Sequence, residues 1–442
     1  MKLIYGVNDK PSNGKTIVFA LQQLLAILAA TIAVPAIVGN GMSQSAALFG
    51  AGVGTLVYLL FTKFKSPVFL GSSFAFINSM FAAFGGAATA ATGYLGLVIG
   101  AVSAGLVYVI LSFVVKKAGV DWINKLMPAV VIGPTVAIIG LSLAGNAVGD
   151  LTKANGANAN GNVYVCLLCG LVTLIVTILA SVYGKNMVKM IPFIIGIVAG
   201  YVLATIFTVI GLIADVEALK IVNFSLFADM KWVPEFTFVK ALGGFSELSA
   251  AYIGTVLVAY VPVAFVVFAE HIADHKNLSS IIEKDLLADP GLDKTLLGDG
   301  VGSIAGALFG GCPNTTYGEC VGCVAISGNA SVKTICTTAC LAILSAFVAP
   351  FVTFLATIPS CVMGGVCIAL YGFIAVSGLK MIQKVDLEDS RNLFTVSVIL
   401  IAGVGGLVVS FGKVTITSVA CALILGIIVN TLVNLKKKES EK

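Results

Sequence analysis

Long stretches without a charged residue dominate the chain. A membrane-spanning helix needs about 20 mainly apolar residues, so the six shorter stretches can hold one span each. The three longest can hold two each, divided at 39–43, 85–87 and 358–360. The pattern therefore predicts twelve spans. The stretches that lack Asp, Glu, Lys and Arg are 16–62, 66–115, 126–149, 154–184, 190–214, 248–269, 334–379, 392–412 and 414–435.

One more apolar stretch, between 292 and 333, contains the acidic residues Asp299 and Glu319. It is most simply read as a helix at about 295–310 followed by a broken segment at about 312–329. None of the stretches alternates polar and apolar residues as the strands of a membrane barrel do. We therefore predict an all-α polytopic membrane protein with 14 transmembrane segments.

Composition and charge agree with a membrane protein. Of the 442 residues, 58% are hydrophobic and only 11% are charged, against roughly 25% charged in a soluble domain. This excludes a soluble enzyme, a disordered chain and a nucleic-acid binder. With both termini on one side, 21 of the 26 Lys and Arg residues fall on that side, which predicts cytoplasmic termini. The net charge of +5 is thus mainly a topology signal, and the polar start, 1–15, predicts no cleavable signal peptide.

The ten cysteines all lie within apolar stretches. Two pairs have Cys-x-x-Cys spacing, Cys166 with Cys169 and Cys320 with Cys323, but no His or second pair accompanies either one in a polar loop. We expect buried free thiols, with no metal, disulfide or cofactor.

Ionisable groups at membrane depth are the strongest candidates for function, because burying them is costly. Glu270 ends the uncharged stretch 248–269, and both histidines, His271 and His275, follow it closely. Glu319 is flanked by apolar sequence, and Asp299 ranks third. Two structural readings compete: Glu270 as a helix-end residue at the interface, and Glu319 as an acid bonded to backbone amides.

The sequence before Glu319 argues against a continuous helix. Pro313 lacks a backbone donor, and the polar residues 314–316 compete for backbone hydrogen bonds. A similar interruption occurs at 65–77, with Pro67 and Gly71. These are the third and the tenth predicted spans, third in each half of seven. Interrupted segments at matching positions of two halves indicate an inverted repeat with a binding site near the membrane midplane.

With these motifs the chain resembles the nucleobase-ascorbate transporter family, also called the nucleobase:cation symporter family, and within it the uracil branch. The resemblance extends in order over nearly the whole chain. It rests on the segments 21–35, 70–77, 269–271, 284–292, 313–319, 362–365 and 371–372. It implies 7+7 inverted repeats with short strands in broken segments 3 and 10. It further implies a core domain from 1–120 (spans 1–4) and 241–358 (spans 8–11), and a gate domain from 121–240 (spans 5–7) and 359–442 (spans 12–14 and a cytoplasmic tail).

The resemblance also implies proton-coupled uptake of uracil across the cell membrane, commonly by a homodimer. Glu270 and Glu319 would then hydrogen-bond the pyrimidine ring, and Gly318 would offer a backbone amide. The remaining contacts would come from Phe74, Tyr317, Ala30 and Tyr371. The chemistry fits independently, because uracil is a flat neutral imide whose N–H groups suit a carboxylate and whose face suits an aromatic ring.

The coupling site is expected at Glu270, with Glu319 mainly a substrate anchor. Close relatives commonly carry a His one turn after the first glutamate, where this chain has Asp274. Asp274 can form a titrating pair with Glu270, His271 or His275 can take the partner role, or Asp274 can be simply cytoplasmic; the sequence leaves these open. After Glu319 the usual Asn is replaced by Cys320.

Other functions remain as alternatives. The nearest is a symporter for xanthine or another purine base of the same family. An anion exchanger or channel would predict a basic residue or a continuous polar stripe in the spans, and neither is visible. A membrane enzyme would need a nucleophile with its base, or metal ligands, at membrane depth.

Overall fold

The computed structural model describes residues 3–119, 128–154, 161–185, 187–411 and 414–434. The chain is mainly helical, which confirms the predicted all-α membrane class. The first half contains α1 (Asn13–Val38), α2 (Gln44–Phe61), β1 (Leu70–Ser72), η1 (Phe74–Phe76), α3 (Ile77–Gly85), α4 (Ala90–Ala118), α6 (Ala129–Ser142), α7 (Ala144–Asp150), α8 (Val163–Tyr183), α9 (Met187–Met190) and α10 (Pro192–Ile213).

The second half follows a connection formed by η2 (Glu217–Leu219), η3 (Phe224–Asp229), α11 (Thr237–Ala241) and η4 (Leu242–Glu247). It contains α12 (Ala250–Ile282), η5 (Leu287–Gly291), α13 (Leu292–Gly310), β2 (Asn314–Thr316), α14 (Gly318–Ser327), α15 (Val332–Ser345), α16 (Ala349–Thr357), α17 (Ser360–Ile382), α18 (Ser390–Val404), β3 (Val409–Phe411), β4 (Val414–Ile416) and α19 (Ser418–Val433).

Eight helices of the described chain are long and apolar enough to cross a membrane, and the pair α15 and α16, bent by 82°, makes a ninth. Each of the fourteen predicted segments contains a helix, but several helices are short, as the broken segments require. The number of complete crossings therefore stays a prediction. Several basic residues used to assign the sides, Lys2, Lys125, Lys413 and the tail 436–442, lie outside the described residues.

The helix contacts repeat between the two halves. Helix α2 packs against α13; α4 packs against α13 and α12, and α15 packs correspondingly against α2 and α1. In a second set, α17 packs on α6, while α8 pairs with α10 as α18 pairs with α19. This exchange of partners is consistent with two inverted repeats of seven segments.

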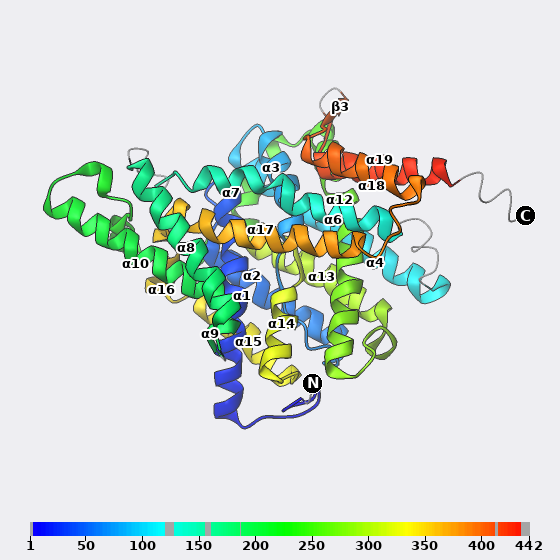
Figure 1. Ribbon diagram of the computed structural model, residues 1–442, viewed down its shortest axis with the longest axis horizontal. Coiled ribbons are helices and arrows are strands. Elements are labelled where there is room, and N and C mark those ends of the chain that lie inside the picture. The colour runs from blue at the N-terminus through cyan, green and yellow to red at the C-terminus, as the bar shows by residue number, and fades with distance from the viewer. Residues whose placement is uncertain (1–2, 120–127, 155–160, 186, 412–413, 435–442) are drawn as a thin grey trace, which may run out of the picture.

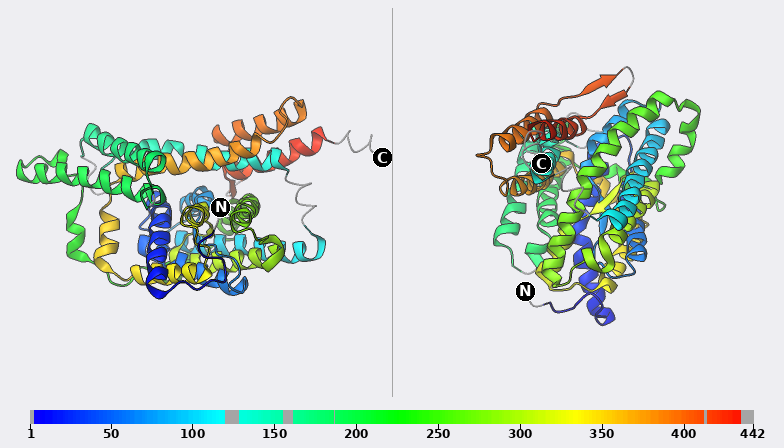
Figure 2. Two further views of the ribbon diagram at one scale, coloured as in Figure 1. Left: turned by 60° about the horizontal axis from the view of Figure 1, so that its bottom comes forward. Right: turned by 90° about the vertical axis from the view of Figure 1, so that its right-hand side faces the viewer.

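The two sets of helices form two layers (Figures 1 and 2). In the left view of Figure 2, α6, α8, α10 and α17–α19 form the upper layer, and α1–α4 with α12–α15 lie below it. Apolar side chains on the outer surface, such as Leu168, Ile175 and Ile178 of α8, are exposed. Such a surface suits contact with lipid rather than water.

Strands β1 and β2 meet in the middle of the lower layer as an antiparallel pair, with Leu70 opposite Thr316, Gly71 opposite Thr315 and Ser72 opposite Asn314. The two short strands predicted in broken segments 3 and 10 are therefore confirmed. Their register is symmetric. Adding 244 to the number of a β1 residue gives the corresponding residue of β2, so that Leu70 corresponds to Asn314 and Ser72 to Thr316. A second antiparallel pair, β3 with β4, precedes α19 and was not predicted from the sequence.

Candidate substrate-binding site

The two broken segments hold each other in place through backbone hydrogen bonds. Beyond the strand pair, the Ser73 amide donates to the Pro313 carbonyl at 2.9 Å, and the Tyr317 amide donates to the Phe69 carbonyl at 3.2 Å. A short helix begins directly after each strand, at Phe74 and at Gly318. The amino-terminal ends of both helices thus meet at one place. Such ends carry partial positive charge and free N–H groups.

The side chain of Tyr317 also holds the two broken segments together where they cross. Its hydroxyl donates to the Ser72 carbonyl at 2.9 Å, so the ring lies across β1. A Cβ atom on Gly71 would come within 2.3 Å of that ring. Gly71 is therefore required for the close approach of the two segments, which explains its place in the motif.

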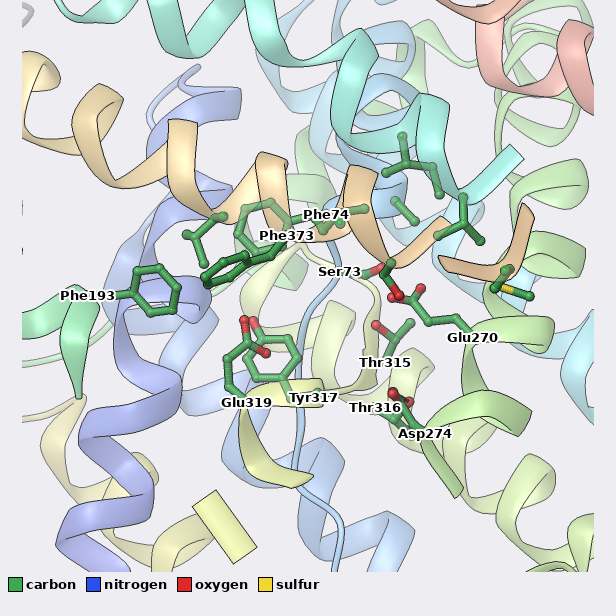
Figure 3. A pocket seen from close by; sticks show the side chains of 18 residues that line it. Ser73, Phe74, Phe193, Glu270, Asp274, Thr315, Thr316, Tyr317, Glu319 and Phe373 are labelled. Atoms are coloured by element: carbon green, nitrogen blue, oxygen red, sulfur yellow. Dashed lines mark hydrogen bonds between the residues drawn. The ribbon is translucent and has the colours of Figure 1, made fainter. Parts of the chain in front are cut away.

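A cavity of about 360 Å³ opens beside this crossing. Figure 3 shows the carboxyl groups of Glu270 and Glu319 facing it from different elements, with the rings of Phe74 and Phe373 beside it. Its lining comprises Ser73, Phe74, Ala75, Val136, Ile139, Phe193, Glu270, Asp274, Thr315, Thr316, Tyr317, Gly318, Glu319, Leu370, Phe373, Ile374, Ser377 and Met381. Five predicted substrate-binding residues are thus brought together: Phe74, Glu270, Tyr317, Gly318 and Glu319.

Three carboxyl groups line the cavity, and among its lining residues there is no Lys or Arg. Glu270 and Asp274 lie one turn apart on α12, so they share a face of that helix. Glu319 lies in the first turn of α14. Holding three carboxylates as anions here, with no cation beside them, is electrostatically costly.

Helix α12 continues for twelve residues past Glu270, to Ile282. Glu270 therefore lies inside a long helix rather than at its end. Asp274 also lies in the cavity wall, where it accepts a hydrogen bond of 2.7 Å from the Thr316 hydroxyl.

His271 lies outside the cavity lining. It is fully buried, with Nδ1 2.6 Å from Asp299 Oδ2 and Nε2 3.1 Å from Thr295 Oγ1. Its ring stacks on His275 at 4.0 Å, and His275 Nε2 lies 2.7 Å from the Tyr58 hydroxyl. The two histidines thus join α12 to α13 and α2, whereas Glu270 and Asp274 face the cavity.

The other two predicted residues support the wall. Tyr371 of α17 is buried, and its ring lies edge-on to Phe74 at 5.9 Å. Ala30 of α1 is also buried. Neither is among the residues that line the cavity.

Several lining residues were not singled out from the sequence. Thr315 and Thr316 belong to the motif that ends in Glu319. The structure shows that they also line the cavity, which the motif alone did not indicate. Phe193 and Phe373 pack edge-on at 5.9 Å, one from α10 and the other from α17. No local pattern distinguishes them from the other aromatic residues of the spans. Among the described residues, no group of three or more His, Cys, Asp or Glu could hold a metal ion.

Solved structures share this fold. The transmembrane domain of the cyanobacterial bicarbonate transporter BicA aligns with a TM-score of 0.64 at 16% identity, covering 96% of this chain and 99% of that one. The murine anion transporter Slc26a9 in its inward-facing state aligns with a TM-score of 0.65 at 12% identity, over 97% of this chain and 70% of that one. At these identities the likeness shows the fold alone.

Sequence relatives are closer. The uracil permease of Bacillus caldolyticus is 39% identical over 434 residues, 98% of this chain and 95% of the relative. The uracil permease of Bacillus subtilis is 39% identical over 99% of this chain and 97% of its own length, and that of Escherichia coli K12 is 36% identical over 96% and 92%. The model of the permease family (Xan_ur_permease) matches residues 14–411. The chain therefore belongs to this permease family, whose members are transporters and not enzymes.

Proposed function

We propose that this permease takes up uracil together with a proton across the cell membrane by alternating access. The observation that carries the proposal is a cavity that brings the carboxyl groups of Glu270 and Glu319 together beside the amino-terminal ends of the two short helices that follow β1 and β2. The named function of the relatives, uracil permease, supports the substrate.

The cavity supplies the groups that uracil needs. A carboxylate can accept its N–H, the backbone amide of Gly318 can donate to a carbonyl, and Phe74 can contact the ring face. An analogue that lacks these paired groups would leave buried polar atoms unmatched, which gives strong discrimination. We assign Glu319 as the main anchor, with Tyr317, Ala30 and Tyr371 shaping and supporting the wall.

The crowded carboxyl groups support proton coupling. A proton bound on Glu270 relieves the cost of three neighbouring anions, and it can leave when water reaches the site. Asp274, one turn away, is its coupled partner, because it shares the cavity while His271 faces Asp299.

Alternating access requires two parts that move against each other. We assign 1–120 and 241–358 to a core domain and 121–240 and 359–442 to a gate domain. The cavity lies between them, since Phe74, Glu270 and Glu319 come from the core while Phe193 and Phe373 come from the gate. The working unit is a homodimer in the lipid bilayer, with both termini cytoplasmic.

A purine base, such as xanthine, is the second candidate. The cavity volume of about 360 Å³ favours it, because pockets of roughly 300 Å³ and above hold ligands larger than one pyrimidine ring. The uracil assignment rests on the relatives and on the Tyr317, Gly318 and Glu319 sequence.

Thermal unfolding of the purified protein with added bases tests the site. A ligand that binds only the folded state raises the melting temperature as its concentration passes the dissociation constant. We expect uracil to raise it in the wild type, and to raise it much less in Glu319→Gln. Stabilisation by xanthine but not by uracil would indicate that xanthine is the substrate. Stabilisation by neither base would contradict the proposal.

A further inference from the structure

Helices α3 and α6 are joined by one hydrogen bond between side chains. Asn78 Nδ2 donates to Ser142 Oγ at 3.1 Å. The Ser142 hydroxyl donates its own hydrogen to the Ile139 carbonyl, also at 3.1 Å. Its lone pairs are therefore free to accept from Asn78, and the donors and acceptors match.

This bond lies directly beside the proposed substrate cavity. Asn78 follows the lining residue Phe74 by four positions, and Ser142 follows the lining residue Ile139 by three. Helices α6 and α17 run antiparallel, because Gly140 approaches Tyr371 and Gly133 approaches Ile382. Ser142 and the lining residue Met381 therefore lie toward opposite ends of the cavity, and the bond lies toward only one end.

The bond also joins the two proposed domains through residues that do not lie in a chain connection between them. A second such bond, between the Tyr201 hydroxyl and Thr357 Oγ1 at 2.8 Å, lies three residues before α17, where the chain passes from core to gate. That position suits a hinge. The Asn78–Ser142 bond, in contrast, can break without straining a connection.

The opposite end of the cavity differs at the matching position. The shift of 244 residues that relates the two strands takes Asn78 to Gly322. A Cβ atom built on Gly322 would meet no atom within 4 Å. One half of the repeat thus carries a bonded side chain where the other half carries a glycine facing open space.

We propose that Asn78 and Ser142 form a latch that holds one entrance of the cavity shut and opens once in each transport cycle. The inference rests on the proposed function, since a latch matters only if the two domains move. With the predicted sidedness, α6 runs from the cytoplasmic to the external side, so the latch closes the external entrance.

Hydrogen–deuterium exchange of the purified protein tests the latch directly. Asn78→Ala and Ser142→Ala should each raise amide exchange in Ile77–Gly85 and in the last two turns of α6. Loss of this bond shifts the closed-to-open ratio about fivefold, which is about 1 kcal/mol at 1.4 kcal/mol per tenfold. The double variant should match the single ones, because both remove the same bond. Exchanging the residues, Asn78→Ser with Ser142→Asn, should restore the wild-type pattern.

Ser103→Ala is the matched control. Ser103 donates to the Gly100 carbonyl at 2.7 Å, three residues earlier, as Ser142 does to Ile139. Within the part of the chain that the structure describes, the Ser103 side chain makes no hydrogen bond to another helix. Its loss should leave exchange in α3 and α6 unchanged. Effects of the two alanine variants that simply add, or exchange that does not change, would overturn the latch.

Transport separates this inference from the proposed function. In proteoliposomes the latch variants should bind uracil within twofold of the wild type while their maximal uptake rate falls several-fold. Unchanged uptake rates in all latch variants would overturn the latch and leave the uracil site intact. A wild type that does not bind uracil would overturn the proposed function, whereas the exchange result would still report on the bond.

Discussion

The Thr316 hydroxyl donates a 2.7 Å hydrogen bond to Asp274 Oδ2, and this bond ties strand β2 to helix α12 at the cavity wall. It holds α12, which carries Glu270, against the strand that directly precedes α14 and Glu319. The acidic residue that departs from the family pattern therefore lies in the site and not at a cytoplasmic helix end.

The bond separates two roles of Asp274. Asn in its place can still accept from Thr316 but cannot take up a proton, whereas Ala can do neither. We expect Asp274→Asn to bind uracil within about threefold of the wild type and Asp274→Ala to bind roughly ten- to a hundredfold more weakly, since a hydrogen bond to a charged group is worth about 1.5–3 kcal/mol. Calorimetric titration with uracil measures both. Equal losses in the two variants would show that the charge, not the bond, matters for binding.

Glu270→Gln tests the coupling assignment. Gln keeps a polar side chain of the same size but has no proton to release. We expect exchange of labelled for unlabelled uracil to continue in this variant while accumulation driven by a proton gradient is lost. One proton moving down 100 mV supplies about 2.3 kcal/mol, equal to a nearly fifty-fold gradient, so the loss is easily measured. Full proton-driven accumulation in Glu270→Gln would contradict the assignment.

Glu319→Gln is expected to weaken uracil binding roughly ten- to a hundredfold, because a charge-assisted hydrogen bond becomes a neutral one in a buried site. Glu247→Gln serves as the control, since Glu247 is exposed. Titration calorimetry with uracil distinguishes the two variants. If Glu319→Gln bound as tightly as Glu247→Gln, Glu319 would have a structural role only.

The ring of Phe74 should contribute to uracil binding, because its face can contact the pyrimidine ring. Phe74→Leu keeps an apolar side chain but removes the ring, and aromatic pairing is worth about 0.5–1.5 kcal/mol beyond buried area. We therefore expect uracil affinity to fall about two- to tenfold, and Phe74→Tyr to lose less. Phe76→Leu is the comparison, because Phe76 stacks on Tyr260 at 5.5 Å and does not line the cavity. An equal effect at both positions would indicate general packing.

The connection before α12 predicts a pH effect on stability. Hydrogen bonds from Lys231 and Lys240 lower the pKa of Glu235 below its ordinary value of 4.5. A lowered pKa in the folded state stabilises it above pH 4.5, and this contribution is lost as the pH falls through the folded value. The melting-temperature difference between wild type and Glu235→Gln should thus be constant from pH 7 to 5 and shrink below 4.5. A difference that grows on acidification would contradict the ion pairs.

Five of the residues that line the cavity were named from the sequence as substrate-binding residues. Pro313 and Gly71 mark the broken segments because each leaves a local signature in backbone chemistry, and charge at membrane depth singled out Glu270 and Glu319. Phe193 and Phe373 carry no such signature, since an aromatic residue in a span can face lipid, core or cavity. Which of these it faces depends on how α10 and α17 pack.

The two histidines also show that the sequence alone does not predict which way a side chain faces. Their position beside Glu270 made them candidates for proton coupling, yet one residue along a helix turns a side chain by about 100°. His271 therefore faces Asp299 on α13 while Glu270 faces the cavity. The partner that decides this, Asp299, is 28 residues away along the chain.

The most direct test of coupled uracil transport is uptake of radiolabelled uracil into proteoliposomes, with and without an inward proton gradient and with unlabelled bases as competitors. We predict that the gradient drives accumulation and that unlabelled uracil competes more strongly than xanthine. Uptake that is indifferent to the gradient would contradict symport, and xanthine outcompeting uracil would contradict the substrate.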